Sequence, residues 1–428
     1  MVLLLRLWCV FVFSMNTYIY PCYTYPLSMT ALRICTPSSA FLSVLLLGGL
    51  FIVVAAGCKS ANTAVSGSSG SAKDPYRIAF YNVENFFDTE DDPLTRDEEF
   101  TPTGKLEWTP ERYAKKVKNI GSVVAAVHPS VLGLCEVENR RVVEDLLKGT
   151  PALVAADYGI CHYDSPDERG IDVALVYRKK DFRVISDRPI RVTMPPDAVD
   201  PNDAPAKPKN SNKQGKNKPV DTTDSTLNAA NQSSAPKKST RSAPTRDILF
   251  VDGIFGGKDT VSFYVNHWPS RRLGDKYSAP RRMAVARTLR RDIDSLLTVR
   301  PKAKIVIMGD FNDQPTDPSI AQGLRARDNV NATGNGDLFA IMYDLHLLDK
   351  GSYFYKGIWD MLDQIIVSPN LLTTQKGSLR AENPVIFEED WIMFKHKDYG
   401  LLPNRTYGGK NYYGGYSDHL PIYLDMHR

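Results

Sequence analysis

Acidic and amide side chains recur in this 428-residue chain directly after short apolar runs. Carboxylate and amide oxygens suit a hard divalent cation such as Mg²⁺, whereas a zinc site would need more histidine or cysteine. One Asp at the end of a strand is usually a turn residue, but six such places in one chain indicate a shared cleft. They are Asn82-Val83-Glu84, Glu136, Asn266-His267, Asp310-Phe311-Asn312, Asp363 and Ser417-Asp418-His419.

Two histidines, His267 and His419, stand beside these oxygen-rich sites. An imidazole next to carboxylates suits proton transfer and contact with phosphate better than ligation of a hard cation. Arg169 and Arg271 offer planar donors that suit phosphate, although Arg271 with Arg272 also fits a solvated loop. A cation, proton-transfer groups and cationic donors are what phosphodiester hydrolysis requires, because negative charge spreads over the phosphoryl oxygens.

The elements that must position these residues alternate between strands and helices. Segments 111–127 and 281–297 have helical periodicity, and Thr109-Pro110-Glu111 is typical of a helix start. Because several strands follow one another with no helix between them, mixed sheets with helices outside fit better than a doubly wound parallel sheet. The predicted strands are 77–83, 131–137, 173–177, 182–192, 248–253, 261–265, 305–308, 361–367 and 422–424.

In this order the motifs resemble those of the endonuclease/exonuclease/phosphatase superfamily, which includes deoxyribonuclease I, abasic-site endonucleases, neutral sphingomyelinases and inositol-polyphosphate 5-phosphatases. Gly309-Asp-Phe-Asn312 and Ser417-Asp-His419, with a single glutamate upstream, carry the resemblance over about Tyr76 to Arg428. It implies a four-layer α/β/β/α sandwich of two mixed sheets with helices outside. It also implies a hydrolase of phosphoric esters that depends on Mg²⁺, with Mn²⁺ or Ca²⁺ as alternatives.

The resemblance implies a catalytic role for five residues. Asp310 and Asn312 match the pair that positions the attacking water or the leaving oxygen. His419 matches the catalytic histidine, oriented by Asp363. His267 matches the second histidine of the deoxyribonuclease I and sphingomyelinase branches, which argues against the abasic-site endonucleases.

The resemblance also implies the groups around these five residues. Asp172 is expected to orient His267. The expected metal ligands are Glu136, Glu84 and Asp418, and the residues expected to bind the substrate phosphate are Asn82, Arg169 and Arg271.

The first 57 residues differ from the rest of the chain. Residues 1–60 contain no Asp or Glu, and an apolar run at 40–56 ends at Gly57-Cys58. Small residues before a cysteine resemble a bacterial lipobox, which is cleaved before the cysteine and lipidated on it; an uncleaved anchor helix is the alternative. Because a signal peptide usually has about 15–30 residues, we expect translation to begin at Met29. The sequence thus predicts an exported, membrane-anchored lipoprotein of a bacterial envelope.

The remaining chain is interpreted as a flexible Ser/Gly/Ala-rich tether at 58–75 and one catalytic domain at 76–428. A segment at about 195–245 has almost no large apolar residue, so we expect a disordered insertion whose lysines are solvated or touch a polyanion. Cys135 and Cys161 form one disulfide or remain two buried thiols. The apolar run around Cys135 favours the thiols.

Composition excludes some classes of function and leaves others open. With 43% hydrophobic and 24% charged residues the chain is not collagen-like, coiled-coil, wholly disordered or polytopic, and a net charge of +4 neither demands nor excludes an anionic partner. The first interpretation is a monomeric endonuclease acting on DNA or RNA. One alternative is a sphingomyelin or phospholipid phosphodiesterase, or a phosphoinositide phosphatase, with 387–394 as the candidate membrane hairpin. A non-catalytic surface binding protein is the other alternative, although every expected motif position is filled.

Overall fold

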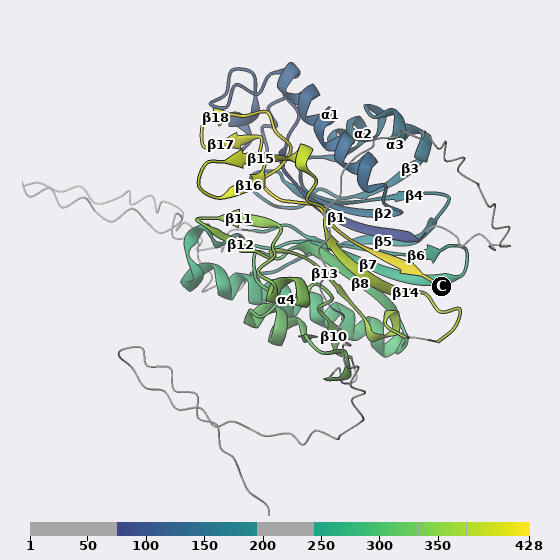
Figure 1. Cartoon of the computed structure of the whole chain (residues 1–428). Coiled ribbons are helices and arrows are strands. Elements are labelled where there is room, and N and C mark those ends of the chain that lie inside the picture. Colours follow the sequence, from purple (N-terminus) through teal and green to yellow (C-terminus); the bar gives the residue numbers. More distant parts are fainter. Residues whose placement is uncertain (1–74, 195–243, 333, 335, 374) are drawn as a thin grey trace, which may run out of the picture. The chain divides into compact units, whose positions relative to one another are not determined.

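The computed structural model describes residues 75–194 and 244–428, apart from 333, 335 and 374. The predicted signal segment, Cys58 and nearly all of the predicted tether and insertion lie outside the described residues. Within them, no helix has the length and apolar character needed to cross a membrane. Two mixed sheets lie against each other with helices on their outer faces (Figure 1), so the predicted α/β/β/α sandwich is confirmed.

The first sheet has six strands in the order β14-β19-β1-β2-β4-β3. β1 and β2 run parallel, and the other neighbours are antiparallel. The bounds are β1 (Tyr76–Phe86), β2 (Val131–Val137), β3 (Tyr158–His162), β4 (Asp172–Arg178), β14 (Arg380–Ile386) and β19 (Ile422–His427).

The second sheet has seven strands in the order β5-β6-β7-β8-β13-β10-β9. β7–β8 and β10–β9 run parallel, and the other neighbours are antiparallel. The bounds are β5 (Phe182–Ile190), β6 (Ile248–Phe255), β7 (Asp259–His267), β8 (Lys304–Asp310), β9 (Ala326–Arg327), β10 (Leu338–Phe339) and β13 (Asp363–Val367). All nine predicted strands are present in the two sheets.

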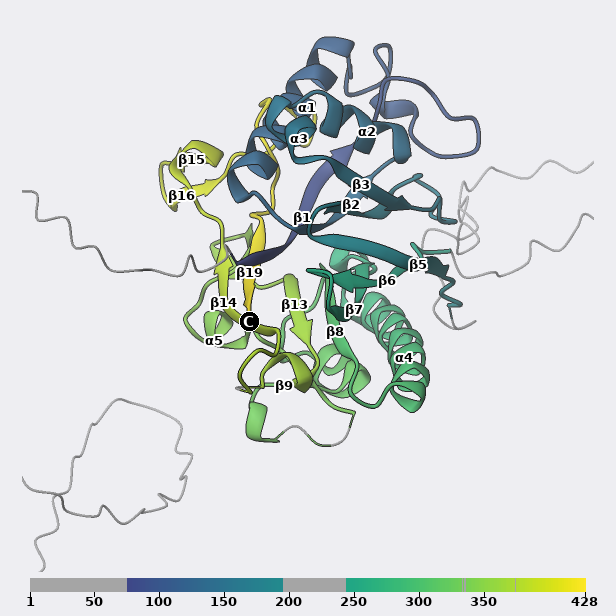
Figure 2. The same ribbon diagram turned by 90° about the vertical axis from the view of Figure 1, so that its right-hand side faces the viewer.

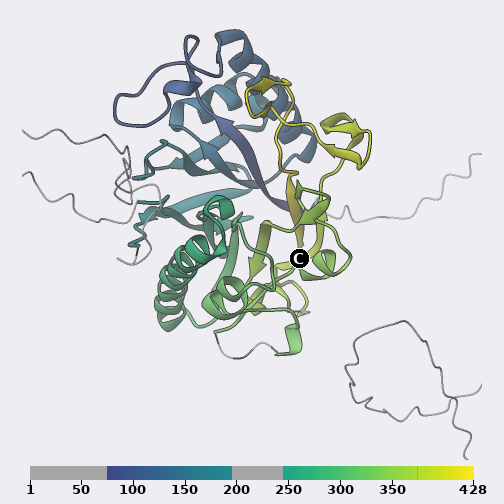
Figure 3. The same cartoon turned by 90° about the vertical axis from the view of Figure 1, so that its left-hand side faces the viewer.

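The helices form the two outer layers. On the first sheet lie α1 (Pro110–Val127), α2 (Arg140–Lys148) and α3 (Pro151–Ala156), and on the second lies α4 (Asp275–Val299) (Figure 2, Figure 3). The short α5 (Tyr343–Leu347) follows β10. Thr109 caps α1, since its side chain accepts a hydrogen bond from the backbone N–H of Arg112. Both predicted helices are confirmed, and α4 begins six residues earlier than predicted.

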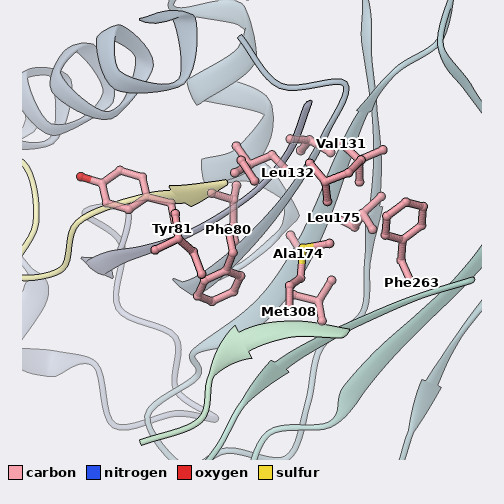
Figure 4. Packing of buried hydrophobic residues seen from close by; sticks show 14 of the residues in the cluster. Phe80, Tyr81, Val131, Leu132, Ala174, Leu175, Phe263 and Met308 are labelled. Atoms are coloured by element: carbon pink, nitrogen blue, oxygen red, sulfur yellow. The ribbon is translucent and has the colours of Figure 1, made fainter. Parts of the chain in front are cut away.

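Apolar side chains from both sheets meet in the centre of the sandwich (Figure 4). Phe80 of the first sheet and Met308 of the second are fully buried there. Gly133 on β2 permits this approach, because a Cβ at that position would lie 2.6 Å from the sulfur of Met308. Cys135 and Cys161 are free, buried thiols, so the alternative of a disulfide is wrong.

Three small hairpins stand apart from the sheets. They are β11 (Tyr353–Tyr355) with β12 (Ile358–Asp360), β15 (Met393–His396) with β16 (Gly400–Pro403), and β17 (Tyr407–Gly408) with β18 (Asn411–Tyr412). The candidate membrane hairpin at 387–394 is not a hairpin, because it runs from the end of β14 through a single helical turn into β15. The hairpin of this region begins at Met393.

Deletion of 195–243 should leave the melting temperature within a few degrees of the intact chain. The register pairs Ile190 at the end of β5 with Ile248 at the start of β6, so a short Gly/Ser turn can join the two strands. Thr245, at the predicted end of the insertion, and Asp247 just after it are buried. Extending the deletion through Asp247 should therefore destabilise the domain. Thermal unfolding of both variants checks this, and a large loss in the shorter deletion would show that 195–243 supports the fold.

Candidate active site

Three polar side chains lie at one level of the second sheet. His267 is the last residue of β7, Asp310 the last of β8 and Asp363 the first of β13. The register pairs Asp310 with His267 on one side and with Asp363 on the other. Paired residues on neighbouring strands point to the same face of a sheet, so the three side chains form a row.

The first sheet contributes Glu136 through an irregularity in β2. The ladders with β1 and β4 both skip Glu136, and its φ is +62°. A left-handed backbone costs about 1–2 kcal/mol for a residue with a Cβ, and such strain is concentrated at functional sites. The backbone N–H of Asn85 donates to Glu136 Oε2 at 2.8 Å and stabilises this conformation. The bulge therefore directs the carboxylate out of the strand ladder.

Asn82 on β1 joins the contributions of the two sheets. Its Nδ2 donates to Asp310 Oδ2 at 3.1 Å and lies 3.4 Å from Glu136 Oε1. Its backbone carbonyl accepts a hydrogen bond from the hydroxyl of Ser417, which in turn accepts one from the backbone N–H of His419. This single buried amide thus fixes the relative positions of two carboxylates and of the segment that carries His419.

Asp310 lies between the two imidazoles. Its Oδ2 is 3.7 Å from His267 Nε2 and 3.9 Å from His419 Nε2. Its Oδ1 accepts a hydrogen bond from the backbone N–H of Asn312, whose Nδ2 donates to the carbonyl of Trp268. Burial raises the pKa of Asp310 to about 7, opposed by the charge of His419.

His419 is held by the carboxylate of Asp363. The His419 Nδ1 to Asp363 Oδ2 distance is 2.6 Å, and the hydroxyl of Ser352 also donates to that oxygen. Burial alone would lower the pKa of His419, but the charge and hydrogen bond of Asp363, with Asp310 and Asp418, raise it well above its usual value. This environment favours the imidazolium form of His419, whose Nε2 lies toward Asp310.

His267 has the opposite environment. Burial lowers its pKa well below the usual value, and the positive charges of Arg246, Arg169 and His419 lower it further. Its Nε2 lies 3.9 Å from Glu136 Oε1, while its Nδ1 has no hydrogen-bond partner among the described residues. The two environments thus favour a neutral imidazole at His267 and a charged one at His419, which is the arrangement expected of a proton acceptor and a proton donor.

The oxygen atoms of the site fit a hard divalent cation. Glu136 Oε1 and Asp310 Oδ2 both approach Asn82 Nδ2 and His267 Nε2, so the two carboxylates converge on one place. Carboxylate oxygens are the preferred ligands of Mg²⁺, Mn²⁺ and Ca²⁺. The nearby sulfur of Cys135 does not compete, because burial raises the pKa of its thiol well above the usual range. Glu136 and Asp310 would hold the cation.

Glu84 and Asp418, the other two predicted metal ligands, have partners within the protein. Glu84 accepts hydrogen bonds from the backbone N–H groups of Thr406 and Tyr407, and Asp418 forms an ion pair with Arg405 at 2.8 Å. Burial raises the pKa of Glu84 to about 7. In this structure both carboxylates bind groups of the loop before His419, and their role as metal ligands stays a prediction.

Asp172 does not contact His267. Its Oδ1 accepts a hydrogen bond from the backbone N–H of Ser165, and its Oδ2 lies 3.5 Å from His162 Nε2. The predicted orienting contact is wrong, because Asp172 opens β4 and faces its neighbour β3, where His162 lies. Arg169 lies near enough to His267 for its charge to lower the pKa of that imidazole, and its contact with a substrate phosphate stays a prediction.

Arg271 is held within the protein. Its Nε donates to the carbonyl of Asn312 at 2.8 Å, and its Nη2 lies 2.6 Å from Asp317 and 3.3 Å from Asp313. The expected contact of Arg271 with a substrate phosphate therefore competes with two carboxylates. In this structure Arg271 positions Asn312.

Three residues that support the site were missed. Ser352 and Tyr353 precede the predicted strand 361–367, and Tyr353 stacks on His419 with ring centroids 4.7 Å apart. Arg246 was assigned to the edge of the insertion. It is buried, donates to the carbonyls of His267 and Trp268, and forms an ion pair with Asp167. A charged residue just before a strand was the only local signal for Arg246.

Arg246→Met should lower kcat about tenfold, because His267 loses the donor that holds its backbone carbonyl. It should also raise the pKa of His267, since the charge of Arg246 lowers it. A proton acceptor works only above its pKa, so the acidic limb of the rate profile should move to higher pH. Arg246→Lys keeps the charge and should leave that limb nearly in place. An unchanged limb in Arg246→Met would contradict the electrostatic role.

A sandwich of two mixed sheets with carboxylates and two histidines at one end defines a metal-dependent hydrolase of phosphoric esters. The chain belongs to the endonuclease/exonuclease/phosphatase family, whose model matches residues 77–202 and 223–428. Enzymes of this family depend on a divalent metal ion, and the chain is a hydrolase of that kind. The comparison with curated protein sequences gives no match.

Several solved structures are similar to the chain. A family member from Bacteroides thetaiotaomicron is 12% identical, with 82% of this chain and 97% of that chain covered and a TM-score of 0.45. A mannosyl-6-phosphatase from the same organism is 13% identical, with 82% and 99% covered and a TM-score of 0.44. The catalytic domain of human Nocturnin is 15% identical, with 82% and 93% covered and a TM-score of 0.45. Similarities this low do not indicate a substrate.

Proposed function

We propose that this protein is a phosphodiesterase that cleaves nucleic acid, DNA or RNA, as an endonuclease and as a monomer. The observation that carries the proposal is Asp310 placed between a neutral His267 and a charged His419. Hydrolysis of an ester with a poor alkoxide leaving group needs a base for the attacking water and an acid for the leaving oxygen. The two imidazoles are suited to one task each.

The residues around Asp310 then have separate functions. His267 Nε2 accepts a proton from the attacking water, and His419 Nε2 donates one to the leaving oxygen or stabilises the phosphoryl charge. Asp363 holds the His419 imidazole and stabilises its charged form. Asn82 and Asn312 orient Asp310. A divalent cation, Mg²⁺ in our proposal, supplies charge neutralisation at the phosphoryl oxygens when it is bound.

A lipid phosphodiesterase is the second candidate, favoured by one observation. The β15–β16 hairpin exposes Phe394 and Leu401, and Trp391 just before it is also exposed. Exposed apolar side chains next to a phosphoric ester site suit a bilayer. Glu388, Glu389 and Asp390 precede these residues and oppose an anionic surface.

The location of the protein is also a proposal. We infer an exported lipoprotein anchored through Cys58, because Val54-Ala55-Ala56-Gly57 precedes this cysteine as in a lipobox. Incorporation of labelled palmitate into the intact chain and its loss in Cys58→Ser test the anchor. A precursor mass that includes Met1 would contradict a start at Met29.

The substrate is tested with one panel. The purified chain is incubated with plasmid DNA, single-stranded DNA, RNA, sphingomyelin vesicles and inositol phosphates, each with Mg²⁺ or with EDTA. We expect Mg²⁺-dependent internal cleavage of nucleic acid. Turnover confined to sphingomyelin or inositol phosphates would favour the second candidate, and no turnover of any substrate would favour a non-catalytic binding protein.

A further inference from the structure

Three rings follow one another outward from the proposed proton donor. Tyr353 stacks on His419 with ring centroids 4.7 Å apart and an interplanar angle of 33°. Tyr355 continues the series, with its ring 6.4 Å from that of Tyr353 and inclined by 17°. Tyr353 is half-buried, whereas 53% of Tyr355 is exposed. The rings of Tyr353 and Tyr355 are nearly parallel and that of Tyr353 is tilted on the imidazole, so a series of aromatic rings leads from the reacting centre to solvent.

The strand geometry holds these rings on one face. Residues 353 and 355 of β11 point to the same side, and Ile358 lies directly opposite Tyr355 on β12. Phe354 points to the other side, where it packs on Trp359 and on Tyr399. Tyr399 belongs to the neighbouring hairpin of β15 and β16, which lies beside β11 and β12 in Figure 1. The buried side of the hairpin is therefore anchored, and Tyr353, Tyr355 and Ile358 form what we call the stacking shelf.

We propose that the stacking shelf binds the unpaired bases of a single-stranded nucleic acid whose backbone phosphate lies at His419. This inference rests on the proposed function and specifies its substrate. Bases stack on aromatic side chains with about 1–3 kcal/mol each, without strong sequence preference. The shelf begins at the catalytic imidazole, so the base next to the scissile phosphate is the one that reaches it.

The orientation of the rings favours a base over an acyl chain. The rings of Tyr353 and Tyr355 are inclined by only 17° to each other, so their flat faces match a planar base. An acyl chain needs no parallel faces. In a duplex the faces of the bases are covered by their neighbours, so an unpaired strand is required.

One lysine of each hairpin supplies a cation beside the shelf, although Asp398 is also exposed in the turn of the second hairpin. Lys356 lies in the turn of the hairpin, with its Nζ 5.1 Å from the ring centroid of Tyr355. Lys395, on the adjacent hairpin, is exposed as well. Single-strand binding surfaces combine aromatic faces with cations that follow the backbone. The same two kinds of group are present here within one pair of hairpins.

The test compares Tyr355→Ala with the wild-type chain. For a single-stranded 12-mer we expect KM to rise about 5- to 150-fold with kcat nearly unchanged, because loss of one stacked base costs about 1–3 kcal/mol. KM should not change for a 12-mer of abasic sugar-phosphate backbone. Tyr355→Phe keeps the ring and should retain most of the affinity. Tyr413→Ala removes another exposed tyrosine, 57% exposed and outside the two hairpins, and should have no effect.

A binding assay separates this inference from the proposed function. Affinity for a fluorescent 12-mer, measured in EDTA so that hydrolysis does not intervene, should weaken by the same factor in Tyr355→Ala. Tyr355-dependent binding without hydrolysis would contradict the proposed function and support the shelf. Equal KM changes for the normal and abasic 12-mers would overturn the shelf. A Tyr355→Ala defect confined to vesicles of phosphatidylcholine and sphingomyelin would overturn it in favour of a membrane-docking surface.

Discussion

His419→Ala should lower kcat by about 10²–10⁴-fold while the melting temperature changes little. The imidazole is the only group that places a positive charge and a proton between Asp310 and Asp363 among the described residues. Loss of a general acid costs about 10²–10⁴-fold, and loss of an electrostatic donor a similar factor. Single-turnover kinetics on the best substrate of the panel measures the effect. A loss below tenfold would show that His419 only lines the cleft.

Asp363→Asn tests how His419 obtains its charge. The carboxylate raises the pKa of His419, so its replacement by an amide should lower that pKa. A proton donor is active only below its pKa, and the alkaline limb of the kcat profile should therefore move to lower pH. The double variant should be little slower than His419→Ala, because residues that act as a unit are not additive. If the rate losses of the two single variants multiplied in the double variant, Asp363 would act independently of His419.

The strands were predictable because their local pattern agrees with their final environment. Val131–Val137 and Lys304–Asp310 are apolar runs that become central strands, buried on both faces. The sequence also predicted that Asp310 and Asp363 line one cleft, since acidic side chains near strand ends face a shared cleft. The pairing of Asp310 with Asp363 on neighbouring strands depends on the register of β8 and β13, which no local sequence pattern specifies.

The partners of charged residues were less predictable. Arg271 was expected to bind a substrate phosphate, but its guanidinium forms ion pairs with Asp313 and Asp317. Nothing in the spacing of these residues along the chain indicated that they would form ion pairs. Asp172 was predicted to orient His267, but it lies beside His162, which ends the neighbouring strand β3. Arg246 follows 195–243, so its distance to His267 is set by tertiary structure alone. Ion pairs between distant segments are chosen by packing, which a single sequence does not reveal.

Glu136→Gln should remove metal-dependent turnover, with a loss of at least about 10³-fold. The bulge directs this carboxylate toward Asp310, and a cation held there neutralises phosphoryl charge worth several kcal/mol. The amide can still accept the hydrogen bond of Asn85, so the melting temperature should stay within a few degrees. Turnover with Mg²⁺ and calorimetric titration with Mn²⁺ measure the two effects separately.

A matched control lies two residues further along the chain. Burial raises the pKa of Glu138 to about 8, so this side chain is mostly protonated at pH 7 and Glu138→Gln imitates its neutral form. Its Oε2 accepts the backbone N–H of Asp88, away from the cluster at Asp310. Glu138→Gln should therefore retain turnover and Mn²⁺ binding at pH 7, while Glu136→Gln loses both. Full activity of the wild-type chain in EDTA would refute the oxygen-ligand site, since Glu136 would then owe its importance to charge alone.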